Sequence, residues 1–188
     1  MKSKIHEYLK KTNNKMSKTM KSTLVMALAI GFITAFMSCG NAQDNANTET
    51  TVQTNISKEQ ANKMLNSYLE IKDALVKTDG ETASKAAGKL VETLGDSQDE
   101  LAKKIRFDAE HISETKDAGH QRDHFNTLSD NIYAVVKATG ANDSKLYRQY
   151  CPMAMDNKGA YWLSAEKEVN NPYFGDKMLH CGSVKEEL

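Results

Sequence analysis

The sequence predicts a mainly α-helical protein: an antiparallel four-helix bundle with a small, irregular C-terminal lobe that contains short strands. Three observations lead to this fold class. Apolar residues recur at helical spacing in four segments between residues 57 and 139. Short links join these segments, which is typical of helices that pack as antiparallel neighbours. After Gly140 the helical spacing is lost, and both prolines and the only tryptophan follow. Two helical hairpins that pack less regularly are the alternative arrangement.

The first two predicted helices have clear starts and ends. Residues 57–60 form a capping box, and the following helix ends at Asp79-Gly80. The second helix ends at Gly95, a residue type favoured at helix C-termini. One apolar face of the first helix consists of Met64, Tyr68, Ile71 and Leu75, and that of the second of Ala83, Ala86, Ala87, Leu90, Val91 and Leu94.

The third and fourth helices complete the predicted bundle. A second capping box, residues 97–100, begins the third helix, and the fourth extends from about residue 120 to Thr139. Their inward residues are Leu101, Ile105 and Ile112 in the third helix, and Phe125, Leu128, Ile132, Val135 and Val136 in the fourth. In the lobe we expect short strands at residues 146–150, 160–163 and 178–184.

The N-terminus has the features of an export signal. Lysines precede an uncharged apolar run of 14 residues, Leu24–Met37, which is short for a membrane span of about 20 residues but suits a secretory signal. Residues 36–40, Phe-Met-Ser-Cys-Gly, resemble the lipobox of bacterial lipoproteins. This resemblance implies cleavage before Cys39 and lipidation of Cys39. We therefore expect a signal peptide at 1–38, a lipidated tether at 39–56 and the folded domain at 57–188, with its lobe at 141–188.

Charge and motif content exclude several classes of function. Residues 1–39 carry seven lysines and one acid, which leaves 18 basic and 24 acidic side chains, a net charge of −6, in residues 40–188. Such a chain has no general attraction for nucleic acid. The sequence lacks Gly-x-Ser-x-Gly, a glycine-rich phosphate loop and His-Glu-x-x-His. We therefore expect neither nucleic-acid binding nor enzymatic activity.

Soft metal-ligand residue types gather between residues 150 and 182. Thiolate, thioether and imidazole groups together favour Cu(I) over hard cations, and thioethers are poor zinc ligands. Alternate side chains of an extended segment share a face, so Cys151, Met153 and Met155 would point together, as would Met178 and His180. Copper is the soft metal that this ligand set favours, and its candidate ligands are Cys151, Met153, Met155, Met178, His180 and Cys181.

The same residues permit other interpretations. Methionine also fills gaps in cores, and Cys151 and Cys181, in an oxidising export compartment, would form a disulfide instead of binding a metal. A disulfide does not exclude a copper site made of methionine and histidine. His120 and His124 lie four residues apart, a spacing that can serve one metal, and are weaker candidates. His111 is expected to stand alone and face solvent.

Four short motifs in this region point to a family. Tyr-Cys-Pro-Met-Ala at 150–154, Gly-Ala-Tyr-Trp-Leu-Ser at 159–164, Asn-Pro-Tyr-Phe-Gly at 171–175 and Met-Leu-His-Cys-Gly at 178–182 resemble the C-terminal signature of a bacterial domain of unknown function, number 3347. Residues 120–125 are similar to the last bundle helix of that domain. The domain occurs alone in exported proteins and fused to adaptor subunits of heavy-metal efflux pumps. The resemblance implies a heavy-metal association, with Cys151, Met153, Met178 and Cys181 as the positions that carry it.

Together these inferences predict an exported lipoprotein, anchored by lipid in the cell envelope and facing the periplasm or the cell surface. Its expected function is to bind copper as a buffer or as a donor to an efflux adaptor protein. The alternative is a metal-free interaction module of the envelope in which Cys151 and Cys181 form a disulfide.

Overall fold

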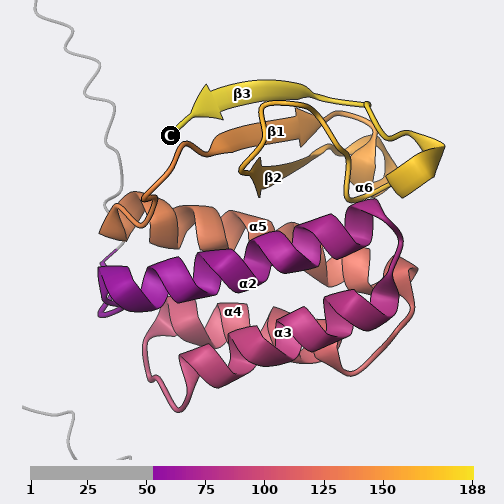
Figure 1. The fold of residues 1–188 in the computed structure, drawn as a ribbon. Coiled ribbons are helices and arrows are strands. Elements are labelled where there is room, and N and C mark those ends of the chain that lie inside the picture. Colours follow the sequence, from indigo (N-terminus) through magenta and orange to yellow (C-terminus); the bar gives the residue numbers. More distant parts are fainter. Residues whose placement is uncertain (1–52) are drawn as a thin grey trace, which may run out of the picture. The chain divides into compact units, whose positions relative to one another are not determined.

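The computed structural model describes residues 53–188, in which four long helices precede a three-stranded sheet (Figure 1). The helices are α2 (Lys58–Val76), α3 (Gly80–Leu94), α4 (Glu100–Ser113) and α5 (Ala118–Thr139). Consecutive helices pack against each other and α2 also packs against α5, so the four enclose one core. The predicted fold class is confirmed. The predicted signal peptide, Cys39 and residues 40–52 of the predicted tether lie outside the described residues.

The apolar faces predicted from helical spacing form the core of the bundle. Nearly all the inward residues predicted for the four helices are buried, and in α2 Met64, Tyr68, Ile71 and Leu75 are fully so. Val91 of α3 is the exception, since it is only partly buried. Within residues 53–188, none of the helices combines the length and the apolar character that crossing a membrane requires.

The start of α4 differs from the prediction. The carboxylate of Asp99, not the side chain of Ser97, accepts hydrogen bonds from the first turn, at 2.9 Å from the Leu101 nitrogen. Asp99 is favoured because its second carboxylate oxygen also accepts a hydrogen bond from the backbone nitrogen of Asn55, at 2.8 Å. Ile56 is buried in the core. Residues 54–56 of the predicted tether are therefore part of the fold.

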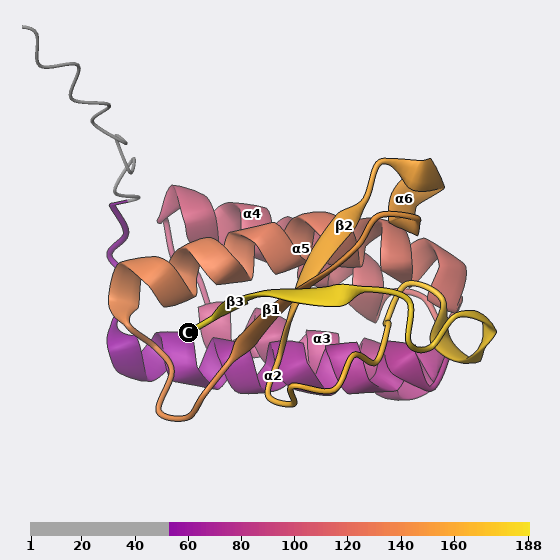
Figure 2. The ribbon, with the colours of Figure 1, turned by 90° about the horizontal axis from the view of Figure 1, so that it is seen from above.

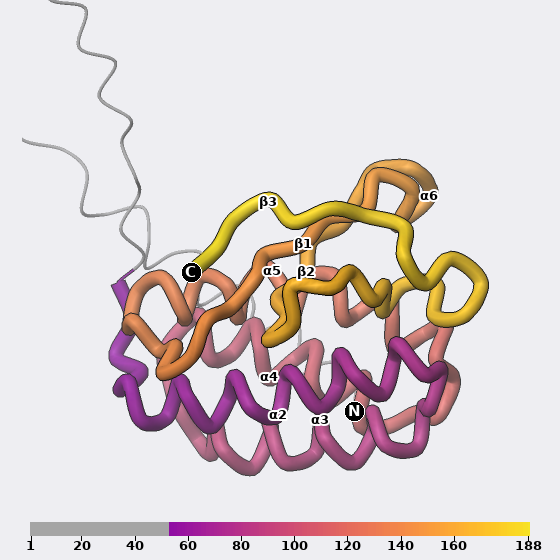
Figure 3. Tube along the Cα trace, turned by 45° about the horizontal axis from the view of Figure 1, so that its top comes forward, coloured from indigo at the N-terminus to yellow at the C-terminus, as the bar shows by residue number. Residues whose placement is uncertain are grey.

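The lobe contains an antiparallel sheet that lies over α2 and α5 (Figures 1 and 2). Its strands are β1 (Tyr147–Cys151), β2 (Ala160–Ser164) and β3 (Ser183–Glu187), in the order β2-β1-β3. Two predicted strands are confirmed, but the third begins five residues later than predicted. Residues 175–181 instead form the 3₁₀ turn η1 (Gly175–Lys177) and a further turn, along the connection that Figure 3 draws in yellow between β2 and β3.

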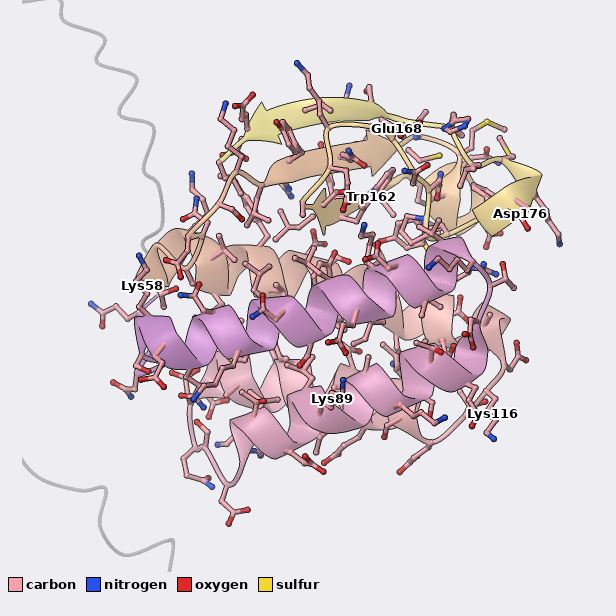
Figure 4. The ribbon with its side chains drawn as sticks, in the orientation of Figure 1. Lys58, Lys89, Lys116, Trp162, Glu168 and Asp176 are labelled. Carbon is pink, nitrogen blue, oxygen red and sulfur yellow. The ribbon has the colours of Figure 1, made fainter. Side chains whose placement is uncertain are left out.

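One buried hydroxyl joins the sheet to the bundle. The Tyr68 hydroxyl of α2 lies 2.9 Å from the Ser129 hydroxyl of α5 and accepts a hydrogen bond from the Leu163 backbone nitrogen of β2 at 3.0 Å. Burial raises the pKa of the Tyr68 phenol, which therefore stays protonated. Next to it Trp162 is buried between the sheet and the helices (Figure 4). Bundle and lobe thus share one hydrophobic core.

Tyr68→Phe should lower the free energy of unfolding by about 1–3 kcal/mol, because it leaves the buried Leu163 nitrogen without an acceptor. The measurement is urea unfolding followed by circular dichroism. Tyr147→Phe is the matched control, since Tyr147 is only partly buried, and should change the free energy by less than about 0.5 kcal/mol. Equal values for the two variants would contradict the role of this hydroxyl.

Candidate functional site

An open pocket of about 490 Å³ lies where the lobe meets the first turns of α5. Three of the predicted ligands, Met153, Met155 and Met178, line this pocket. Met153 is 46% exposed, so this residue is accessible from solvent. The other lining residues are Gly119, Arg122, Asp123, Asp156, Asn157, Tyr173 and Phe174. Methionines that lie 25 positions apart in the sequence are therefore brought to one opening.

A left-handed turn, not a strand, brings Met155 to the pocket. Strand β1 ends at Cys151, and the turn α6 (Ala154–Asn157) follows (Figure 1). Met155, Asp156 and Asn157 have φ values of 52°, 57° and 65°. Aspartate and asparagine adopt this left-handed conformation more easily than other residues, whereas it costs about 1–2 kcal/mol for a residue such as Met155. The prediction that Cys151, Met153 and Met155 alternate along an extended segment is wrong. All three left-handed residues nevertheless line the pocket, and such strain is often found at functional sites.

Asn171 organises the loop that carries Met178. Its side-chain nitrogen donates to the Cys181 carbonyl at 2.8 Å, and its side-chain oxygen accepts from the Tyr173 nitrogen at 2.8 Å. The Tyr173 hydroxyl in turn donates to the Tyr161 carbonyl of β2 at 2.7 Å. Burial raises the pKa of Tyr173, so this phenol stays a neutral donor. These hydrogen bonds hold the loop that contributes Tyr173 and Met178 to the pocket.

Arg122 of α5 fixes the lobe to the bundle beside the pocket. Its Nε donates to the Pro172 carbonyl of the lobe at 2.8 Å, and its Nη2 donates to the Leu75 carbonyl of α2 at 3.0 Å. Burial lowers the pKa of Arg122, but an arginine stays charged in proteins. Gly175, with φ of +55°, allows the close approach here, because a Cβ on it would lie 2.6 Å from the Thr78 hydroxyl oxygen.

The formal charges that line the pocket favour a cation. Asp123 and Asp156 contribute two carboxylates, and Arg122 contributes one guanidinium. That guanidinium already donates to two backbone carbonyls, of Pro172 and Leu75. The methionines supply soft, neutral donors, and the carboxylates supply negative charge close to them.

The two cysteines form a pair of their own. Their sulfur atoms lie 2.9 Å apart and both thiols are free, with Cys151 buried and Cys181 partly buried. Neither cysteine lines the methionine pocket. The hydrogen bond to Cys151 raises the pKa of the Cys181 thiol, which favours the protonated form. A thiol must lose its proton before it binds a metal, whereas a thioether has none to lose.

The histidines do not join the methionines. The exposed His180 places its Nδ1 2.9 Å from the Val169 carbonyl and does not line the pocket, so the predicted pairing of Met178 with His180 on one extended face is wrong. His120 and His124 lie on α5 with ring centroids 5.1 Å apart. His111 does not stand alone, because its ring stacks on that of His124 with centroids 4.4 Å apart. The spacing of residues within α4 or within α5 does not predict this contact between His111 and His124, because it depends on how the two helices pack.

Residues 64–144 match the family described as Protein of unknown function (DUF3347). The predicted resemblance to DUF3347 is confirmed over these residues. The match to DUF3347 covers most of α2 and all of α3, α4 and α5, and it ends before β1. The motifs between residues 150 and 182 lie outside it, so the heavy-metal association that they imply remains a prediction. No curated protein and no solved structure matches this chain.

Mild oxidation of the full chain should join Cys151 to Cys181, because their sulfur atoms are already in contact. The cysteines are 30 positions apart, and the chain-entropy relation then gives a stabilisation of about 3–4 kcal/mol. Urea unfolding of the oxidised and the reduced protein measures the difference. Cys151→Ser/Cys181→Ser is the control and should respond to neither oxidant nor reductant. Two free thiols that persist after oxidation would contradict this assignment.

Proposed function

We propose that this protein binds Cu(I) through the thioethers of Met153, Met155 and Met178. The observation that carries the proposal is that these three methionines line one open pocket next to two carboxylates. Thioethers are soft ligands that select Cu(I) over Mg²⁺ or Ca²⁺ and are poor ligands for Zn²⁺. Asp123 and Asp156 add negative charge that attracts a cation to the opening.

The proposed location explains why thioethers would be used. A lipobox-like segment at residues 36–40 and the preceding apolar run indicate export and lipid attachment at Cys39, so the domain would work in the cell envelope. Thiols are oxidised to disulfides in such a compartment, but thioethers are not. In this proposal the methionines hold the metal, and the Cys151–Cys181 pair stabilises the loop beside them.

A buffer or donor role follows from the exposure of the site. Because Met153 is 46% exposed, a bound ion would remain within reach of a partner that takes it over. The adaptor subunit of an efflux pump is the partner class that the family resemblance implies. A deeply buried site would instead retain its ion.

The Cu(I) affinity of the full chain tests the proposal directly. It is measured anaerobically by competition with a colorimetric Cu(I) chelator, in a Cys39→Ser/Cys151→Ser/Cys181→Ser background so that no thiol competes with the methionines. Loss of a residue that only hydrogen-bonds to a metal ligand typically weakens metal binding by about 10- to 100-fold. Met153→Leu/Met155→Leu/Met178→Leu removes the ligands themselves and should weaken Cu(I) binding by more than that. Leucine has a similar volume, so the fold should persist.

Met64→Leu is the matched control, because Met64 is fully buried in the bundle and its loss should leave Cu(I) affinity unchanged. The single variant Met153→Leu, at an exposed position, gives a second measurement that carries no risk to folding. Unchanged affinity in the triple variant would end the proposal, as would equal losses in the triple variant and in Met64→Leu.

A metal-free interaction module is the second candidate function. The 2.9 Å separation of the two cysteine sulfurs favours it, because a disulfide there would close the lobe without any metal. Counting free thiols in protein purified from the envelope shows whether the disulfide forms. A disulfide together with negligible Cu(I) affinity would rule out the first candidate and favour the second.

A further inference from the structure

Three imidazole rings gather on the face where α4 and α5 meet, apart from the methionine pocket. The ring centroids of His111 on α4 and His124 on α5 are 4.4 Å apart, and those of His120 and His124 are 5.1 Å apart. His120 is exposed and His111 and His124 are partly buried, so each of the three residues has some exposure to solvent. None of the three lines the methionine pocket.

A buried carboxylate orients His124. Asp108 is only 4% exposed, and its Oδ1 lies 3.1 Å from Nδ1 of His124. Its other oxygen accepts a hydrogen bond from the Thr127 hydroxyl at 2.8 Å. An ionised carboxylate can only accept a hydrogen bond, so Nδ1 of His124 carries the proton that it donates. In the neutral ring Nε2 is then unprotonated and has a free lone pair.

His111 is prepared in the same way. Its Nδ1 lies 2.8 Å from the backbone carbonyl oxygen of Phe107, which also can only accept. The neutral ring of His111 therefore presents an unprotonated Nε2. Histidines that bind metals typically donate their other ring nitrogen to a carboxylate or a backbone carbonyl. Both kinds of partner occur here: a backbone carbonyl for His111 on α4 and a carboxylate for His124 on α5.

We propose that His111, His120 and His124 form a site for a borderline divalent cation such as Cu²⁺ or Zn²⁺. Imidazole suits these ions, and Cu²⁺ is bound most tightly of the first-row divalent metals. The negative charge of Asp108 behind His124 compensates part of the charge of the cation. This site is distinct from the methionine pocket in both ligands and preferred oxidation state, and it does not depend on the proposed Cu(I) binding.

Binding requires a side-chain rotation. Among residues 53–188, no three His, Cys, Asp or Glu side chains already surround one point at metal-ligand distance. The rings of His111 and His124 are inclined by only 24°, so their lone pairs lie in nearly parallel planes. Turning His111 about its side-chain bonds lets its Nε2 and that of His124 face one ion. This rotation disturbs the hydrogen bond between His111 Nδ1 and the Phe107 carbonyl, so the bond to the metal must outweigh that loss.

Cu²⁺ is the probe that tests this site. It is titrated without reductant into the full chain, and binding is followed by electron paramagnetic resonance, which detects nitrogen ligands through their hyperfine coupling. The wild type should show a nitrogen-coordinated Cu²⁺ species. Asp108→Asn removes a residue that hydrogen-bonds to a proposed ligand, so it should lower the Cu²⁺ affinity by about 10- to 100-fold and shift the spectrum. His111→Gln/His124→Gln removes two proposed ligands, so it should abolish this species and lower the Cu²⁺ affinity by more than that.

Two controls separate this site from other causes. His180→Gln also removes one exposed histidine, but in the lobe, and should leave the Cu²⁺ species unchanged. The Met153→Leu/Met155→Leu/Met178→Leu variant should leave it unchanged as well, so failure of the Cu(I) proposal and failure of this one are distinguishable. If the double histidine variant does not fold, the single variant His111→Gln replaces it and should also lower the Cu²⁺ affinity. Equal Cu²⁺ binding in wild type and variant would overturn the proposal and leave only an aromatic stack with Phe107.

Discussion

The guanidinium of Arg122 holds the C-terminal lobe to the helical bundle beside the methionine pocket. It donates from α5 to the Leu75 carbonyl near the end of α2 and to the Pro172 carbonyl of the lobe, so three segments meet at one side chain. Without this contact the Leu75 and Pro172 carbonyls would each lose a charged donor in a half-buried place. Arg122 also lines the pocket, together with Gly119 and Asp123 of the same helix.

The cysteine and methionine sulfurs of the lobe lie at two separate places and are suited to different roles. The thiols of Cys151 and Cys181 touch each other at the junction of β1 with the loop before β3, where they are suited to joining segments of the chain. The thioethers of Met153, Met155 and Met178 lie at an opening, where they are suited to ligand binding. The raised pKa of Cys181 reinforces this division, because a protonated thiol is a weak metal ligand. The left-handed turn at residues 155–157 is the conformational cost of placing Met155 at that opening.

Sequence spacing was sufficient for the helices and for most of the core, because the repeat of Met64, Tyr68, Ile71 and Leu75 has one helical interpretation. It was insufficient wherever a residue responds to a distant partner. Asp99 displaced Ser97 as the cap of α4 because residues 54–56 pack beside it. Met153 and Met155 line one pocket, but a left-handed turn places Met155 there and not the predicted extended segment with Cys151. The spacing of the sulfur residues gave no indication of this turn. The contact of His111 with His124 depends on the relative position of two helices, which spacing within each helix does not fix.

The central claim is that thioethers in the lobe bind copper, and X-ray absorption at the copper edge tests it most directly. The sample is the full chain with Cys39→Ala, Cys151→Ala and Cys181→Ala, loaded with one equivalent of Cu(I), so that methionine is the only source of sulfur. We expect a first coordination shell dominated by sulfur that is lost when Met153, Met155 and Met178 are changed to leucine. A first shell of nitrogen and oxygen alone would contradict copper binding by these methionines.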